Sequence, residues 1–500
     1  MANFFKDNDD LQYYFDKGVD WDALVQITEH DFAEADGEGF KTTEEALDFY
    51  RDILEMFGEF VAEEIKPYEK EIDEKGVEFV DGEVVFPERL AGIFEKIKEL
   101  DLHGLTLPRE LGGMNAPMLV YFMNSELMAR ADVSAMAHHG FHGGIAMAAL
   151  VFSALEGSSD IDPVTGRINE TRWRKLIEEI ASGEAWGCMD ITEPDAGSDM
   201  AALRAVGEQD ADGNWFVTGE KIFITSGHGK YHFVIARTED TDVNDPTGGL
   251  NSLSMFLVPT YEDDAEGNRR RIVQLSRVEE KLGHHGSATC GLVYDRAPAE
   301  LVGKRGEGFK YMLTLMNNAR LGVGFECLGL SESAYRAAVD YAAERTSMGK
   351  TIDRHEMIAE YLDTMRTEIQ GIRAMAVTAC YHEEIAQKLG MLVRYGDLDG
   401  DDLEQVERQM KSHQKKSRRI TPLLKYFAAE KAVEHARTSL QIHGGNGYTT
   451  EYLPEKLLRD ALVMPIYEGN SQIQALMAMK DTLGGIISNP QDFVRRMAQA

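Results

Sequence analysis

The hydrophobic pattern of the chain changes its period twice, and this feature constrains the fold most. In residues 43–75 apolar side chains recur every three or four positions, as on the buried face of an amphipathic helix. Between residues 215 and 294 they gather in short runs separated by turns such as Asp212-Gly213. Helical spacing returns at Phe309. We therefore expect an α+β multidomain protein in which a β domain separates two helical domains.

This order predicts four segments. Residues 1–40 contain several large aromatic side chains, so we expect an N-terminal extension packed on the helical domain that follows. Residues 41–185 are predicted to form an N-terminal α-helical domain, and residues 186–303 a middle β-barrel or sandwich domain. Residues 304–500 are predicted to form a C-terminal four-helix bundle with a helical insertion near residues 390–418. Its long helices are expected at 309–347, 358–393, 403–443 and 472–487.

Composition excludes several classes of function. The net charge of −34 would repel nucleic acid and anionic membranes, so neither is an expected partner. The four cysteines are far apart, which argues against a disulfide framework and a zinc site. The acidic run 397–408 lacks the glycine and the glutamate of a calcium loop, so no metal is expected. Residues 1–20 do not resemble a signal peptide and no apolar window is long enough to span a membrane, which predicts a cytoplasmic protein.

One acidic residue has the surroundings of a general base. Glu468 lies between the bulky pair Ile466-Tyr467 and Gly469, just before a helical pattern resumes. Apolar neighbours remove water from a carboxylate and raise its pKa, which makes it a better proton acceptor near neutral pH. Taken alone this is weak evidence, because a glutamate in a loop is more often a solvated side chain or a neighbour of a helix N-cap.

Four further segments change that balance. Residues 191–199 (Ile-Thr-Glu-Pro-Asp-Ala-Gly-Ser-Asp) offer hydroxyl and backbone donors, and residues 221–227 place Phe223 and Thr225 on one strand face. Residues 344–350 end a helix with a cation and a hydroxyl, and residues 441–448 contain a glycine turn that a ligand could approach closely. Each segment alone has a packing, capping or turn explanation, but their joint occurrence in this order does not.

Together with Tyr467-Glu468-Gly469, these segments resemble the acyl-CoA dehydrogenase family over roughly residues 43–483. The resemblance implies an FAD enzyme, a homotetramer built as a dimer of dimers. It implies oxidation of an acyl-CoA substrate to the 2,3-enoyl-CoA, with electrons passed to an electron-transfer flavoprotein. An acyl-CoA oxidase and a non-catalytic flavoprotein assembly partner of the same fold are the alternatives.

The resemblance also assigns roles to individual residues. Glu468 would remove the α-proton. Cofactor contacts would fall on Thr192, Ser198, Phe223, Thr225, Arg345, Ser347, Gln441, Gly445, Asn470 and Gln472, with those at 345, 347, 441 and 445 supplied by a neighbouring subunit. Substrate contacts would fall on Ser198, Arg320, Tyr467 and Gly469.

Several positions depart from the family pattern or leave a choice open. Phe223, Met189 and Asn470 stand where relatives often carry other residues, which makes the cofactor contacts less certain than the base. Some relatives place the base just before the arginine matched by Arg320, but Ala319 cannot abstract a proton. Met136 replaces an arginine of the glutaryl-CoA branch, which disfavours a dicarboxylic substrate. For the three residues His138, His139 and His142, packing and substrate contact both remain open.

Overall fold

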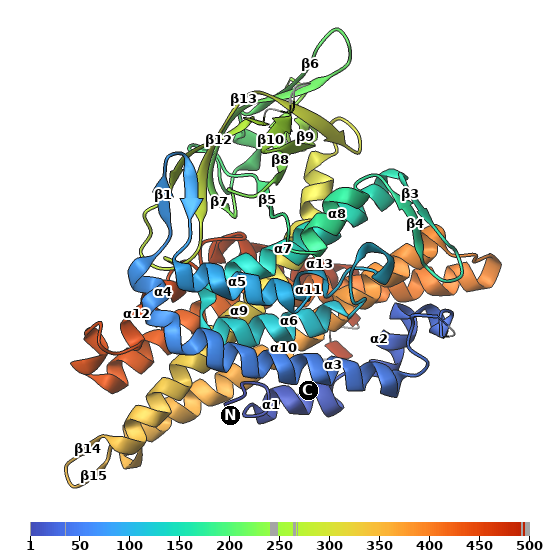
Figure 1. Cartoon of the computed structure of the whole chain (residues 1–500). Coiled ribbons are helices and arrows are strands. Elements are labelled where there is room, and N and C mark those ends of the chain that lie inside the picture. The colour runs from blue at the N-terminus through green and yellow to red at the C-terminus, as the bar shows by residue number, and fades with distance from the viewer. Residues whose placement is uncertain are drawn as a thin grey trace.

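The computed structural model describes residues 2–35, 37–240, 249–263, 267, 269–491 and 494–495. The outer ends of the predicted first and last segments, residue 1 and residues 496–500, lie outside this range. Figure 1 shows the strands of the middle part of the chain gathered at the top of the molecule and most of the helices packed below them. None of the helices in the described ranges has the length and apolar character needed to cross a membrane.

The N-terminal part is helical with two small hairpins. Its helices are α1 (Asp9–Tyr13), α2 (Trp21–Thr28), α3 (Thr43–Phe60), α4 (Glu69–Lys75), α5 (Glu88–Glu99), α6 (Met118–Ala131), α7 (Val133–Glu156) and α8 (Arg174–Ala181). Its strands are β1 (Glu78–Val80), β2 (Glu83–Val85), β3 (Ser159–Ile161) and β4 (Ile168–Thr171), paired as β1-β2 and β3-β4. The continuous helical pattern over 43–75 is interrupted around Pro67, whose ring carries no N–H for the helical ladder.

The middle part is a closed barrel, which settles the choice between barrel and sandwich. Its strands are β5 (Gly187–Asp190), β6 (Val206–Gln209), β7 (Trp215–Thr225), β8 (Tyr231–Arg237), β9 (Leu253–Pro259), β10 (Tyr261–Asp263), β11 (Arg269–Arg271), β12 (Val273–Val278) and β13 (Thr289–Val302). Strand β9 pairs with both β13 and β8, and β13, β7, β6 and β8 pair in that order, so the ring closes. Two runs predicted as separate strands, 215–217 and 221–225, are one strand, β7.

The C-terminal part is built from four long helices. They are α9 (Gly308–Glu344), α10 (Glu356–Tyr395), α11 (Gly400–His443) and α13 (Ser471–Ser488), with the short helix α12 (Pro454–Ala461) and the hairpin β14 (Thr346–Ser347) and β15 (Lys350–Thr351) between them. Helices α6, α9, α10 and α11 share one buried apolar cluster with α3. The α+β class with helical, β and helical parts is thus confirmed.

The first 40 residues add to the same core. Phe4, Phe5, Phe15 and Trp21 are buried in the cluster that also contains Tyr50 of α3. Ion pairs hold the segment as well: the Arg130 guanidinium donates to both oxygens of Asp7 at 2.5 and 2.7 Å. On α10, Arg373 pairs with Glu126 at 2.6 Å, with Glu332 at 2.8 Å and with Asp10 at 3.5 Å.

Candidate active site

Glu468 lies in the turn between α12 and α13, and its backbone is left-handed. Its φ is +54° and that of Gly469 is +93°, a pair of values that L-residues adopt rarely and that occurs preferentially at functional sites. The Gln474 side chain fixes the turn, because its Nε2 donates to the carbonyls of Glu468 and Gly469 at 3.4 Å. A Cβ at residue 469 would lie 2.4 Å from the same nitrogen, so the turn requires glycine there. The strained turn therefore sets where the Glu468 side chain points.

The carboxylate of Glu468 lies near two cations. Its Oε2 atom is buried and has no hydrogen-bond partner among the described residues. Burial raises the pKa of Glu468, whereas the charges of Arg320 and Lys425 lower it. Arg320 donates through Nε to the backbone carbonyl of Glu468 at 3.3 Å. The arginine therefore braces the backbone, and one carboxylate oxygen stays free to accept a proton.

The loop at 191–199 is anchored by a residue that sequence reasoning did not select. Glu193 is buried and accepts from the N–H groups of Arg204 and Ala205 at 2.6 and 3.0 Å. It also accepts from the fully buried ammonium of Lys221 at 2.8 Å. The motif does contain this glutamate, directly before a proline, but Lys221, the partner of Glu193, lies 28 residues away in the sequence.

This anchor brings two predicted cofactor contacts next to each other. The Ile222 N–H donates to the Thr192 carbonyl at 2.9 Å, so Thr192 lies beside the residue that precedes Phe223. Phe223 has a φ of +61° at a break in the register between β7 and β13, and its side chain is 59% exposed. Thr225 ends the same strand and is half-buried. An aromatic ring and two threonines thus line one edge of the barrel.

A hydrogen bond joins this edge to the turn that carries Glu468. Asn470 Nδ2 donates to Ser198 Oγ at 3.2 Å, and Asn470 Oδ1 caps α13 by accepting from the Ile473 N–H at 3.0 Å. Gln472 follows in the exposed first turn of α13. Two segments 272 residues apart therefore meet beside Glu468, with their hydroxyl and amide groups on the surface of the single chain.

The remaining predicted cofactor contacts form a second group. Arg345 and Ser347 lie at the tip between α9 and α10, and Gln441 and Gly445 lie where α11 ends. The end of α9 packs on Ile442, which brings these four positions to one end of the helical bundle. In Figure 1 the hairpin β14-β15 at this end lies far from the barrel. Within the described residues no hydrogen bond or ion pair links this group to Glu468.

Three buried histidines lie on α7, and one of them bonds to the barrel. The Nδ1 of His138 is 2.9 Å from Ser226 Oγ, directly after Thr225, and its Nε2 accepts from the Ala288 N–H at 2.7 Å. The rings of His142 and Trp186 are 3.6 Å apart, edge to face. His139 packs at 5.9 Å from the ring of Phe57. Burial lowers the pKa of all three histidines, so they are neutral near pH 7.

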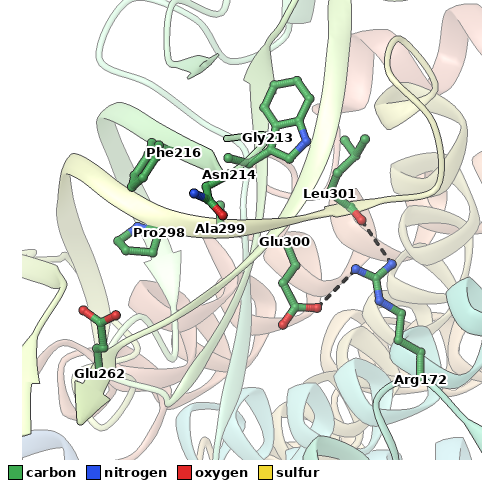
Figure 2. A pocket seen from close by; sticks show the side chains of 10 residues that line it. Arg172, Gly213, Asn214, Phe216, Glu262, Pro298, Ala299, Glu300 and Leu301 are labelled. Atoms are coloured by element: carbon green, nitrogen blue, oxygen red, sulfur yellow. Dashed lines mark hydrogen bonds and ion pairs between the residues drawn. The ribbon is translucent and has the colours of Figure 1, made fainter. Parts of the chain in front are cut away.

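Two other features of the structure resemble binding sites. Figure 2 shows a pocket on the barrel, but its Arg172 is already paired with Glu300 and with the Leu301 carbonyl, both at 3.1 Å. None of the predicted site residues lines this pocket. In the barrel core, Cys188, Asp190 and His232 come close enough to hold an ion. Because His232 Nδ1 lies 2.8 Å from Asp190 Oδ2 and 3.0 Å from Cys188 Sγ, we interpret the group as a hydrogen-bond network.

Comparisons with known proteins match one family along most of the chain. Family models match for the acyl-CoA dehydrogenase N-terminal domain at residues 48–156, the middle domain at 188–297 and the C-terminal domain at 306–393 and 403–483. The 3-methylmercaptopropionyl-CoA dehydrogenase of Ruegeria pomeroyi is 31% identical over 445 residues, which cover 86% of this chain and 70% of that protein. An acyl-CoA dehydrogenase of Bacillus subtilis is 30% identical over 440 residues, which cover 87% and 97%.

Solved structures share the fold. The butyryl-CoA dehydrogenase from Megasphaera elsdenii superposes with a TM-score of 0.68 at 22% identity, covering 87% of this chain and 98% of that one. A Bacillus anthracis acyl-CoA dehydrogenase complexed with FAD superposes with a TM-score of 0.67 at 22% identity, covering 89% and 69%. The chain therefore belongs to the acyl-CoA dehydrogenase family, and it is an oxidoreductase of that family.

Proposed function

We propose that the protein dehydrogenates a CoA thioester between its α and β carbons, with Glu468 as the base that removes the α-proton. One observation carries the proposal: a buried carboxylate oxygen, with no hydrogen-bond partner in the described part of the chain, lies in a strained turn that is bonded to the loop of Thr192 and Ser198. The cofactor is FAD, as in the family. When bound, FAD accepts the hydride that leaves the β carbon.

The residues around the turn fit a flavin. A planar, weakly polar ring system needs an aromatic or apolar wall and a few hydrogen-bond donors at its edge. The exposed ring of Phe223 supplies the wall, and Thr192, Thr225 and Ser198 supply hydroxyl groups along the same edge of the barrel. Apart from the chain neighbours of each glycine, no atom of the described residues lies within 4 Å of a Cβ built on Gly444 or Gly445. Those two positions could face a cofactor held by another subunit.

The chain itself can assist the proton transfer. Removing an α-proton builds negative charge on the thioester oxygen, and each well-placed donor stabilises such charge by about 3–4 kcal/mol. The N–H groups of Ile466, Tyr467 and Ser471 are used in backbone hydrogen bonds, but the Glu468 N–H has no acceptor within the described residues. We assign it to the thioester oxygen. Arg320 keeps the Glu468 carbonyl in place, and Tyr467 is proposed to exclude water from the reacting carbons, with Gly469 beside it.

The second group of predicted cofactor contacts bears on how the subunits assemble. Arg345, Ser347, Gln441 and Gly445 lie apart from Glu468 in one chain, which supports a homotetramer in which they complete a neighbour's cofactor site. An electron-transfer flavoprotein is the proposed acceptor. The described cysteines are free and buried, in keeping with the proposed cytoplasmic location.

Flavin reduction tests the proposal directly. Straight, branched, aromatic and alicyclic acyl-CoAs are mixed anaerobically with the purified yellow protein, and loss of flavin absorbance is followed. The wild type is expected to bleach with at least one of them, and Glu468→Gln is expected to bind flavin but not bleach. Glu451→Gln, which changes an exposed glutamate on the preceding loop, is the matched control. Bleaching of Glu468→Gln at the wild-type rate would overturn the assignment, and oxygen consumption in air would identify an oxidase.

A further inference from the structure

A second buried carboxyl lies directly behind the residue that precedes the base. Glu326 on α9 is 4% exposed, and the Tyr467 hydroxyl donates to its Oε2. Its other oxygen, Oε1, has no partner within the described residues. Helix α9 also carries Arg320, which braces the Glu468 carbonyl. Helix α9 therefore contacts the turn at two successive residues, Tyr467 and Glu468.

Glu326 is uncharged near neutral pH. The pKa of Glu326 is raised to about 8: burial raises it most and the charges of Glu468 and Asp460 add to the rise, whereas the Tyr467 hydrogen bond and the Lys425 charge lower it. The pKa of Tyr467 is also raised by burial, so its hydroxyl stays protonated and donates a hydrogen bond to Glu326. Lys425 is the cation on this side: its Nζ donates to the Met464 carbonyl at 2.8 Å and lies 5.8 Å from the Tyr467 ring. The carboxyl of Glu326 thus acts as a neutral acceptor.

We propose that Glu326 is a positioning residue for Glu468: its carboxyl holds the Tyr467 hydroxyl and thereby fixes the turn that presents the base, without placing a second negative charge beside it. An apolar side chain at 326 would leave a buried hydroxyl without an acceptor. A side chain charged at neutral pH would sit unpaired in the same apolar surroundings. The inference rests on the proposed function, because it takes Glu468 to be the base.

A double-mutant cycle on flavin reduction tests the role. Glu326→Leu is expected to slow reduction by the best acyl-CoA about tenfold, because the Tyr467 hydroxyl loses its acceptor. Glu326→Gln keeps a neutral acceptor and is expected to stay within about threefold of the wild type, which is a rescue that simple filling of space would not give. Tyr467→Phe removes the other partner and is expected to lose about tenfold, since it leaves the carboxyl unpaired.

Non-additivity is the decisive readout. The double variant Glu326→Leu with Tyr467→Phe should lose about tenfold rather than the roughly hundredfold of two independent effects. The loss should fall on the rate of reduction and leave the acyl-CoA concentration for half-saturation within about threefold, as expected when an interaction orients the base. Asp340→Leu, at an exposed acid on the same helix, is the matched control and should behave as wild type. Additive losses, or a Glu326→Gln variant as slow as Glu326→Leu, would overturn the role.

The melting temperature separates this inference from the proposed function. The same four proteins, without acyl-CoA, should show non-additive shifts in Tm if the hydroxyl and the carboxyl interact. Additive shifts in Tm would show that the two groups do not interact, and this would refute the positioning role even if the wild type bleaches normally. Failure of every acyl-CoA to bleach the wild type would instead overturn the proposed function, and the positioning role with it, whatever the Tm values show.

Discussion

The ion pair between Glu193 and Lys221 offers the sharpest test of how the site is built. Glu193→Ala would leave the Lys221 ammonium, which is fully buried, with only the Ile191 carbonyl at 2.9 Å. It would also remove the acceptor of the Arg204 and Ala205 N–H groups. Burial lowers the pKa of Lys221 and the Glu193 charge raises it, so the substitution removes the interaction that keeps this lysine charged.

The magnitude follows from the two states open to Lys221. If the ammonium stays charged, removing one partner of a buried pair costs about 3–5 kcal/mol. If it loses its proton at pH 7, the cost is about 1.36 kcal/mol for each of the ~3.4 pH units by which pH 7 lies below the ordinary lysine pKa, or about 4.6 kcal/mol. Both routes lead to a loss of about 3–5 kcal/mol in the free energy of unfolding. For a unit the size of the barrel, that loss corresponds to a fall in Tm on the order of 10–20 °C.

Calorimetry and flavin content measure the effect. The barrel transition of Glu193→Ala should move down by this amount, and the protein should lose flavin, because the loop of Thr192 and Ser198 loses its anchor. Since a discharged lysine is favoured at high pH, the deficit should shrink between pH 7 and 10. A second variant, Glu193→Leu with Lys221→Met, removes both charges and should recover part of the loss. A deficit below about 1 kcal/mol, or one that does not shrink with pH, would refute the reasoning.

Two further predictions concern the turn and the histidines. Asn470→Ala should lower stability by about 1 kcal/mol through the lost cap of α13 and should slow flavin reduction several-fold, because the link to Ser198 is lost too; unchanged Tm and rate would contradict this. Burial lowers the pKa of His103 to about 4 and of His139 to about 3, so the folded state favours their neutral forms. Stability is therefore complete above the unfolded pKa of about 6.5 and falls as the pH drops, by about 2 kcal/mol for each histidine at pH 5. Tm measured from pH 8 to 5 should fall less steeply in His139→Gln than in the wild type, and equal slopes would exclude the contribution.

The parts of the fold that could be predicted are those that local patterns specify. Strand β8 was predicted with its observed ends, because its first five residues are β-branched or aromatic and Gly227 and Gly229 precede it. The long helices α9, α10, α11 and α13 begin and end within a few residues of the predicted positions. Strands β5 and β6 were missed. All four residues of β5 are buried and those of β6 are mostly exposed, so neither shows the alternation that marks a half-buried strand.

The residues of the candidate site also fall into two groups, those that the sequence pattern indicates and those that it does not. The apolar neighbours of Glu468 are adjacent in sequence, so its burial could be anticipated. The contributions of Glu193 and Glu326 could not, because their partners lie 28 and 141 residues away. The left-handed backbone at Glu468 was equally invisible, since only the neighbouring Gly469 hinted at an unusual turn. Long-range pairs and backbone strain depend on the tertiary fold, which residue patterns do not specify.

The N-terminal extension has a consequence for where this protein can be divided. The match to the family's N-terminal domain begins at residue 48, yet the aromatic core already includes Phe4 and Phe5. A fragment that begins at that point would lack the Asp7 carboxylate and the Phe4 carbonyl, which accept hydrogen bonds from Arg130. It would also expose apolar side chains along α3 to water. The start of the family domain at residue 48 and the start of the folded unit therefore do not coincide, and a shortened version of this protein would have to keep the residues before 48 to keep its core complete.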